Sequence, residues 1–273
     1  MNKVCFVGGG NMANAMLSGL RRQLPTLSCH VIEPFALARE RLASLGVTVH
    51  ESACREAVQG ADAVVLAVKP QVLREACAAL RPHLTGELIV SIAAGARIAS
   101  IARWLGADSG AARIVRTMPN TPALIGQGIT GLYAPEALAE ADVATATALM
   151  RSTGAVVRVA DEAMIDAVTA VSGSGPAYVF HWIESMLAAA KGVGFDDADA
   201  RTLVLATLKG ATALAEASDE TPAVLRERVT SKGGTTAAAL AVIEARGVRE
   251  ALIDAVRAAR DRGAELGAAS DGD

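Results

Sequence analysis

Short apolar runs alternate with helix-like segments along the first 160 residues of the chain. The runs are KVCFVG, CHVIEP, VTVH, DAVVLAVKP, ELIVSIAAG, ARIVRTMPN and AVVRVAD. They are rich in β-branched residues and almost continuously apolar, which is typical of parallel strands covered by helices on both faces. Residues 1–160 are therefore predicted to form a doubly wound α/β domain of Rossmann type.

After residue 160 the strand signals disappear, and long segments rich in Ala and Leu take over. Asp196 or Asp197 can cap one helix, and Thr221 followed by Pro222 suits the start of another. Residues 161–273 are predicted to form an all-helical domain. Because its helices carry Ala on more than one face, we expect them to pack against a second copy of the chain. The expected helices span about 163–193, 197–217, 222–230, 235–245 and 248–267.

Composition narrows the class of partner. Hydrophobic residues make up 52% of the chain and aromatic residues only 3%, so aliphatic side chains build the interior. The net charge is -3, with acidic and basic residues interspersed, and this balance predicts neither nucleic acid nor an anionic membrane as a partner. A small molecule is the expected ligand.

The N-terminus leads directly into KVCFVGGG without the apolar segment of a signal peptide, and no apolar run is long enough to span a bilayer. We therefore expect a soluble cytoplasmic protein. The cysteines lack CxxC spacing, so neither a disulfide nor a metal site is expected. They are Cys5, Cys29, Cys54 and Cys77.

The segment FVGGGNMANAM contains a glycine motif directly after a strand and at the start of a helix. Gly8 permits the tight turn, Gly10 lets the backbone approach a pyrophosphate, and Ala13 allows close packing of helix on strand. The helix N-terminus adds N–H groups and a positive dipole. This context predicts that the N-terminal domain binds a dinucleotide.

Cofactor preference stays open on the sequence. Glu33 ends the second strand about 20 residues after Ala13, where an acid can bind the ribose of NAD and repel the 2′-phosphate of NADP. Arg39 and Arg41 follow on the next helix and either reach a 2′-phosphate or are solvated surface arginines, which are the commoner case. Both NAD(H) and NADP(H) are therefore compatible with the residues.

Further loops end strands at the carboxyl edge of the sheet, where open α/β folds bind ligands. Lys69 lies between a strand end and Pro70 in AVKP, so it is either a cofactor contact or a solvated lysine. SIAAG ends the next strand, and MPNTPAL ends the one after. There two prolines flank Asn120 and Thr121, which either face a nicotinamide or belong to a rigid connector.

Two polar breaks interrupt the helical half. AVSGSGPAYVF frees backbone N–H groups and hydroxyls where Pro176 begins a helix, unless it is a plain helix–helix turn. SKGGTT places two glycines and two threonines at a helix start, where exposed amides can hold a carboxylate. The alternative is that Thr235 simply caps the helix.

The histidines do not indicate acid–base catalysis. His30 and His50 occupy strand positions, His83 follows a proline in a loop, and His181 lies between two aromatic residues of a helix. If hydride transfer occurs, its acceptor must need little help from a general base. A protonated imine meets that condition, whereas an alcohol substrate does not.

Together these motifs resemble those of the pyrroline-5-carboxylate reductase family. FVGGGNMA, AVKPQ, SIAAG, MPNTPAL, VSGSGPAY and SKGGTT occur in the family's order over essentially the whole chain. The resemblance implies a Rossmann domain and a helical domain interlocked with another subunit, and from the cysteine spacing no metal is expected. It also implies reduction of (S)-1-pyrroline-5-carboxylate to L-proline by NADPH or NADH, the last step of proline biosynthesis.

The resemblance also assigns site residues. Thr236 resembles the family threonine that hydrogen-bonds the imine nitrogen. The cofactor-binding residues would be Val7, Gly8, Gly9, Gly10, Asn11, Met12, Ala67, Val68, Lys69 and Pro70, with Met118, Pro119 and Asn120 beside the nicotinamide. The substrate-binding residues would be Ser172, Gly173, Ser174, Gly175, Pro176, Gly234, Thr235 and Thr236.

Two other classes of protein share parts of this plan. A β-hydroxyacid dehydrogenase needs a lysine about one turn after its second glycine motif, where this chain has Val179. A protein that binds a dinucleotide without turnover would use only the glycine motif, for cofactor binding, and would catalyse no reaction. An assay of proline formation from the imine separates it from a reductase.

Overall fold

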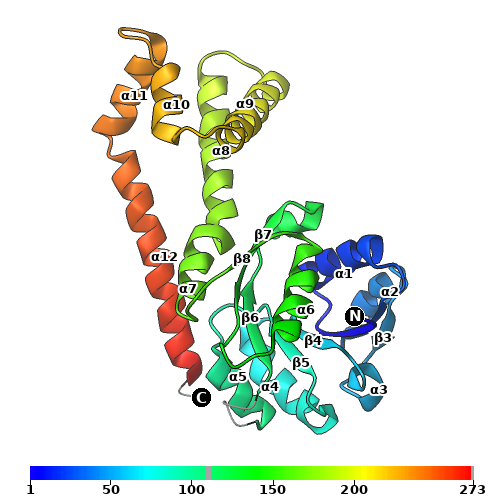
Figure 1. Ribbon diagram of the computed structural model, residues 1–273. Coiled ribbons are helices and arrows are strands. Elements are labelled where there is room, and N and C mark those ends of the chain that lie inside the picture. The colour runs from blue at the N-terminus through cyan, green and yellow to red at the C-terminus, as the bar shows by residue number, and fades with distance from the viewer. Residues whose placement is uncertain (108–111, 272–273) are drawn as a thin grey trace. The chain divides into compact units, whose positions relative to one another are not determined.

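The computed structural model describes residues 1–107 and 112–271 (Figure 1). Eight strands form one sheet in the order β3-β2-β1-β4-β5-β6-β7-β8. Neighbouring strands are parallel except β6 and β7, which are antiparallel. The strands are β1 (Lys3–Val7), β2 (Ser28–Ile32), β3 (Thr48–His50), β4 (Ala63–Leu66), β5 (Leu88–Ser91), β6 (Ile114–Met118), β7 (Gly128–Tyr133) and β8 (Gly154–Arg158).

Helices connect these strands. They are α1 (Asn11–Gln23), α2 (Ala36–Ala43), α3 (Arg55–Val58), α4 (Pro70–Leu80), α5 (Ile98–Leu105), α6 (Glu140–Arg151) and α7 (Met164–Val168), with short 3₁₀ turns η1 (Arg81–His83) and η2 (Thr121–Ile125). The order of the first six strands is that of a dinucleotide-binding fold. The prediction of a doubly wound α/β domain is confirmed.

The sheet buries both of its faces. Val4 and Phe6 of β1 belong to one apolar cluster, whereas the alternate residues Cys5 and Val7 belong to another. Side chains of α1 and α6 complete the first cluster, and side chains of α4 and α5 complete the second. Because successive strand residues point to opposite faces, a strand covered on both sides must be apolar at nearly every position.

The sequence pattern did not reveal β7. Its sequence, GITGLY, contains two glycines, which are poor strand formers. The glycines serve close packing, since a methyl group on Gly131 would lie 2.5 Å from Cγ1 of Val168 and one on Gly128 would lie 3.0 Å from the carbonyl oxygen of Thr153. The strand therefore depends on tertiary contacts that local periodicity does not record.

The remaining helices follow a short π-helical segment, η3 (Thr169–Gly173). Two predicted N-caps are confirmed: the side chain of Asp196 accepts a hydrogen bond from the amide of Asp199 (2.8 Å), and Thr221 accepts one from the amide of Val224 (3.4 Å). These helices are α8 (Gly175–Gly192), α9 (Asp197–Ala217), α10 (Pro222–Arg228), α11 (Thr235–Ala245) and α12 (Val248–Asp271). No helix within the described residues is long and apolar enough to cross a membrane.

The chain divides into two compact units. One comprises Met1–Pro176 with Ala258–Asp273, and the other comprises Ala177–Arg257. The division does not fall at residue 160, because Ile165 and Ala170 are fully or almost fully buried within the first unit. The functional domain boundary at residue 160 stays a prediction.

The second unit buries little of its own apolar surface. In Ala177–Arg257, which is described throughout, the buried hydrophobic residues are Ala200 and Val204. Large apolar side chains on its helices are instead exposed, among them Phe180, Trp182, Leu203, Leu214, Val242 and Leu252. Such a surface marks an interaction site.

A buried ion pair joins the sheet to α7. The guanidinium of Arg116, in β6, is 1% exposed and donates to the carboxylate of Asp166 (2.9 Å). It also lies 3.4 Å from Oε1 of Glu162, which accepts a second hydrogen bond from the amide of Ile98 (2.7 Å). Residues 162–166 are therefore fixed to β6, an inner strand of the sheet.

Arg116→Met should lower the free energy of unfolding by about 3–5 kcal/mol, because it leaves the buried carboxylate of Asp166 without its cation. Arg158→Met is the matched control: its pair with Glu140 is exposed, and its loss should cost about 0–1 kcal/mol. Urea denaturation of both variants measures the difference. Equal losses would contradict a structural role for the buried pair.

Candidate active site

The glycine loop after β1 is confined on two sides. Gly8 has φ of +98°, and a methyl group on it would lie 2.8 Å from the carbonyl oxygen of Ala67. A methyl group on Gly9 would lie 2.3 Å from Cδ1 of Leu42. By contrast, no atom of the described chain lies within 4 Å of a methyl position on Gly10. The loop is therefore packed against the protein except at Gly10, where space is open.

The start of α1 faces this space with free amides. Gly10 is the N-cap, and no side chain of the described residues caps the helix. The side-chain amide of Asn14 donates to the carbonyl oxygens of Gly9 (2.8 Å) and Gly10 (2.9 Å), which orients the loop. The sequence motifs did not single out Asn14, although an amide one turn into the helix can reach back to the loop. The uncapped helix start is suited to an anion.

Glu33 lies at the base of the same loop. Its side chain accepts hydrogen bonds from the amides of Gly9 (2.9 Å) and Phe35 (3.0 Å), and the residue is 7% exposed. Arg39 donates to the carbonyl oxygens of Glu33 (2.9 Å) and Pro34 (2.7 Å). Its guanidinium is thus engaged by the protein's own backbone, in contrast to the predicted reach toward a 2′-phosphate.

The end of β4 adjoins the glycine loop. The amide of Ala67 donates to the carbonyl oxygen of Val7 (2.8 Å), and Lys69 is the N-cap of α4, whose first residue is Pro70. The predicted cofactor segments Val7 to Met12 and Ala67 to Pro70 therefore meet at one edge of the sheet. Their contacts with a cofactor stay a prediction.

A second pair of predicted motifs also meets. The side-chain amide of Asn120 donates to the carbonyl oxygen of Ser172 (3.1 Å), and its oxygen accepts from the amide of Ile129 (3.0 Å). A methyl group on Gly173 would lie 2.7 Å from Cε of Met118. The MPNTPAL loop and the SGSGP segment are in contact, and the Asn120 side chain supports the rigid-connector alternative.

The SGSGP segment is not the turn that the sequence suggested. Thr169–Gly173 form a π-helix, in which the amide of Ser174 donates to the carbonyl oxygen of Thr169 (2.7 Å). The hydroxyl of Ser172 bonds the carbonyl oxygen of Val168 (3.0 Å). The π-helix widens the path of the backbone. The Ser174 amide and the Ser172 hydroxyl, which the sequence predicted to be free, are hydrogen-bonded within the segment. Such π segments are frequent at functional sites.

The SKGGTT segment lies in the second compact unit. Gly233 has φ of +74°, and a methyl group on Gly234 would lie 2.4 Å from the hydroxyl oxygen of Ser231. Gly234 is the N-cap of α11, and within the described residues its cap position has no side-chain hydrogen bond. The alternative that Thr235 caps this helix is therefore wrong. The helix begins with Thr235 and Thr236, and its first amides are left for another partner.

The titratable groups near the glycine loop are not set up as catalysts. His30 and His50 stack with ring centroids 5.2 Å apart, and one ring nitrogen of each lies 2.9 Å from the other. Burial, followed by Lys3 and His50, lowers the pKa of His30. Burial raises the pKa of Cys5 to about 12. Within the described residues no group of three or more His, Cys, Asp or Glu could hold a metal ion.

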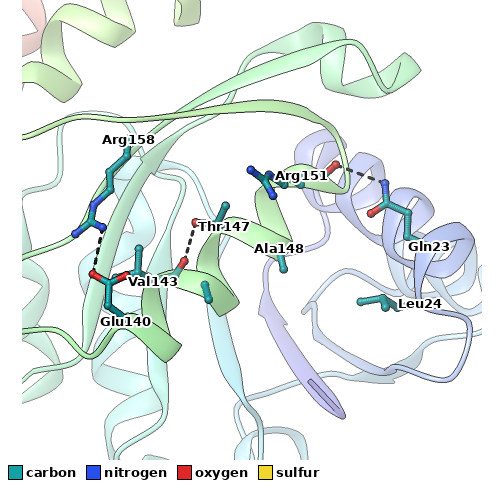
Figure 2. A pocket seen from close by; sticks show the side chains of 9 residues that line it. Gln23, Leu24, Glu140, Val143, Thr147, Ala148, Arg151 and Arg158 are labelled. Carbon is teal, nitrogen blue, oxygen red and sulfur yellow. Dashed lines mark hydrogen bonds and ion pairs between the residues drawn. The ribbon is translucent and has the colours of Figure 1, made fainter.

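A shallow pocket of about 550 Å³ lies away from these motifs (Figure 2). It is formed along α1, α6 and β8, where Arg158 and Glu140 form an ion pair (3.4 Å). Gln23, which lines it, is at the opposite end of α1 from the glycine loop, and the 13 residues of that helix span about 20 Å. The pocket contains none of the predicted site residues.

The sheet order, the confined glycine loop and the uncapped α1 are those of a dinucleotide-binding fold, here followed by a helical C-terminal part. Family models agree with this class. The model described as pyrroline-5-carboxylate reductase dimerisation matches residues 162–266. The model described as NADP oxidoreductase, coenzyme F420-dependent, matches residues 3–95.

Full-length relatives identify the family. A pyrroline-5-carboxylate reductase of Pseudomonas aeruginosa is 45% identical over 97% of this chain and 96% of its own. The structure of a pyrroline-5-carboxylate reductase from Coxiella burnetii matches with a TM-score of 0.88 and 36% identity, covering 96% of this chain and 97% of that one. Pyrroline carboxylate reductase from Plasmodium falciparum with NADP bound matches with a TM-score of 0.84 and 27% identity, covering 97% and 98%. This chain belongs to the pyrroline-5-carboxylate reductase family, which confirms the resemblance.

Asn120→Asp should loosen the π-helical segment selectively. The carboxylate still accepts from the amide of Ile129 but no longer donates to Ser172, so one bond should be lost at a cost of about 1–3 kcal/mol. Amide hydrogen exchange should accelerate over residues 169–174 and stay unchanged in β7. Unchanged exchange at Ser174 would contradict this role for Asn120.

Proposed function

We propose that this chain reduces 1-pyrroline-5-carboxylate to L-proline with a reduced nicotinamide dinucleotide. The observation that carries the proposal is the open space at Gly10 in front of the uncapped start of α1, within a loop that is otherwise tightly packed. Membership of the reductase family supplies the substrate class. Production of proline from the imine, measured with each cofactor, tests the activity.

The residues at the carboxyl edge of the sheet fit the cofactor. Amides at the start of α1 would receive the pyrophosphate, and a side chain at position 10 would project into the open space in front of them. When bound, the cofactor supplies the hydride. The cofactor-binding set proposed here comprises Val7, Gly8, Gly9, Gly10, Asn11, Met12, Glu33, Ala67, Val68, Lys69 and Pro70, with Met118, Pro119 and Asn120 near the nicotinamide.

The substrate carboxylate would bind the start of α11. Other helical threonines, such as Thr169 and Thr212, donate their hydroxyls to the carbonyl four residues earlier. Thr236 is the second residue of its helix, so the residue four positions earlier lies outside the helix. Its hydroxyl is therefore available to a ligand. We assign Thr236 as the catalytic threonine, with Gly234 and Thr235 supplying amides and residues 172–176 lining the substrate pocket.

The reaction needs no general base from the chain. A hydride and its electron pair form the new C–H bond at C5 of the protonated imine, and the C=N π electrons become the lone pair of the amine. The nitrogen keeps its proton, so the protein only has to orient the imine toward the cofactor and neutralise the charge of the substrate carboxylate. The absence of base chemistry in this scheme agrees with a stacked His30–His50 pair and a His181 side chain that is 83% exposed.

The helical unit would complete itself with a second subunit. Its exposed apolar helices and the match of residues 162–266 to a dimerisation family support a homo-oligomer built on an interlocked dimer. A monomeric mass in light scattering would contradict it. The proposed reaction acts on a small molecule and requires neither nucleic acid nor a membrane as a partner. A cytoplasmic location stays a prediction from the sequence.

Gly10→Ala should weaken cofactor binding by about tenfold or more while the protein remains folded, because the methyl group enters the space required by the pyrophosphate. Calorimetric titration with the oxidised dinucleotide measures the effect. Gly210→Ala in α9 is the control, since its methyl group also meets no described atom within 4 Å but lies on another helix. Equal affinities in all three proteins would reject this placement.

Thr236→Ala should lower kcat/KM for the imine by roughly 5- to 150-fold, the equivalent of one hydrogen bond worth about 1–3 kcal/mol. Dinucleotide affinity should stay nearly unchanged. Thr212→Ala removes a hydroxyl that bonds its own helix and should leave kcat/KM unaltered. Full activity of the Thr236 variant would reject the role.

A further inference from the structure

We propose that Glu33 selects a cofactor without a 2′-phosphate, so that this enzyme uses NADH in preference to NADPH. The inference rests on the proposed function and deepens it. It also departs from the relative from Plasmodium falciparum, which is described with NADP bound.

Glu33 acts as an internal anion between two loops. One oxygen accepts from the amide of Gly9 in the glycine loop (2.9 Å), and the other accepts from the amide of Phe35 (3.0 Å), the N-cap of α2. The end of the second strand is where dinucleotide folds receive the adenosine ribose. The amides of Gly9 and Phe35, which could otherwise donate to a phosphate there, thus already donate to the Glu33 carboxylate.

The carboxylate is held in place and poorly hydrated. The residue is 7% exposed, and the amide of Glu33 itself donates to the carbonyl oxygen of His50 (2.8 Å). Because two amides hold the Glu33 carboxylate, it cannot rotate away from an incoming phosphate. A 2′-phosphate would therefore bring its negative charge against an existing one, and burial weakens the screening that water provides.

The neighbouring cation does not compensate. Arg39 donates to the carbonyl oxygens of Glu33 and Pro34, and it pairs at 3.5 Å with Glu51, whose side chain is 77% exposed. To hold a phosphate it would have to give up these partners. Arg41 is exposed on the same helix, and its contribution is separated by mutation below.

A ribose hydroxyl meets different chemistry. An ionised carboxylate offers about four acceptor sites, and the two amides occupy two of them. The remaining lone pairs can accept from the 2′-hydroxyl of NAD, which is a neutral donor. The same side chain therefore attracts one cofactor and repels the other.

The test compares binding of NAD⁺ and NADP⁺ by isothermal titration calorimetry, without turnover. NAD⁺ should bind the wild-type protein about tenfold or more tightly than NADP⁺. Glu33→Gln removes the charge but keeps an acceptor, and it should narrow the affinity ratio by about fivefold or more. The ratio is informative even if loss of the Gly9 bond weakens both ligands equally. Equal wild-type affinities, or a tighter fit of NADP⁺, would overturn the inference.

Two controls address other charges. Glu40→Gln removes an exposed acid from α2 and should leave the ratio unchanged. Arg41→Gln should also leave it unchanged, and a selective loss of NADP⁺ affinity in that variant would contradict exclusion of the 2′-phosphate. If Glu33→Gln fails to fold, adenosine 5′-monophosphate and adenosine 2′,5′-bisphosphate compete for the wild-type site, and stronger competition by the bisphosphate overturns the proposal.

Turnover distinguishes this inference from the proposed function. If no proline forms with either NADH or NADPH, the reductase activity itself is refuted. Proline formation that is faster with NADPH than with NADH, at equal subsaturating concentrations, would refute only the role of Glu33.

Discussion

The close approach of the glycine loop to its neighbours is the constraint on which the rest of the site depends. Gly8 packs against the backbone of Ala67, just after β4, and Gly9 packs against Leu42 of α2. Backbone atoms of Ala67 leave no room for a side chain at Gly8, and a side chain at Gly9 would require Leu42 to move, so the path of the loop is restricted. Because that path delivers the chain into α1, the free amides of the helix and the open side of Gly10 have a fixed direction relative to the sheet.

A second set of contacts fixes the MPNTPAL loop. β6 contributes Arg116 to an internal ion pair with α7, and Asn120, just beyond the strand, bridges β7 and the π-helical segment. These contacts explain why the first compact unit extends to Pro176, although the dimerisation family model already begins at residue 162. The start of the helical region is structurally part of the sheet domain.

The sequence predicted most of the fold because its signals were local. Apolar runs marked seven strands, and Asp196 and Thr221 marked two helix starts. β7 was missed because its glycines are explained by Val168 and Thr153, which are distant in the sequence. Likewise, Ser, Gly and Pro indicate a turn as readily as a π-helix, and only the bond from Ser174 to Thr169 separates them. For Glu33, the position was evident, but its partners Gly9 and Phe35 were not.

The apolar surface of Ala177–Arg257 has a consequence for how the protein is maintained. A segment that buries only Ala200 and Val204 among its described hydrophobic residues gains little free energy by folding alone. Its order must then be supplied by association, and mass action links that order to concentration. On strong dilution we therefore expect the helical unit to lose structure before the sheet does, and the ligand-binding role proposed for the amides of α11 would then require the assembled state.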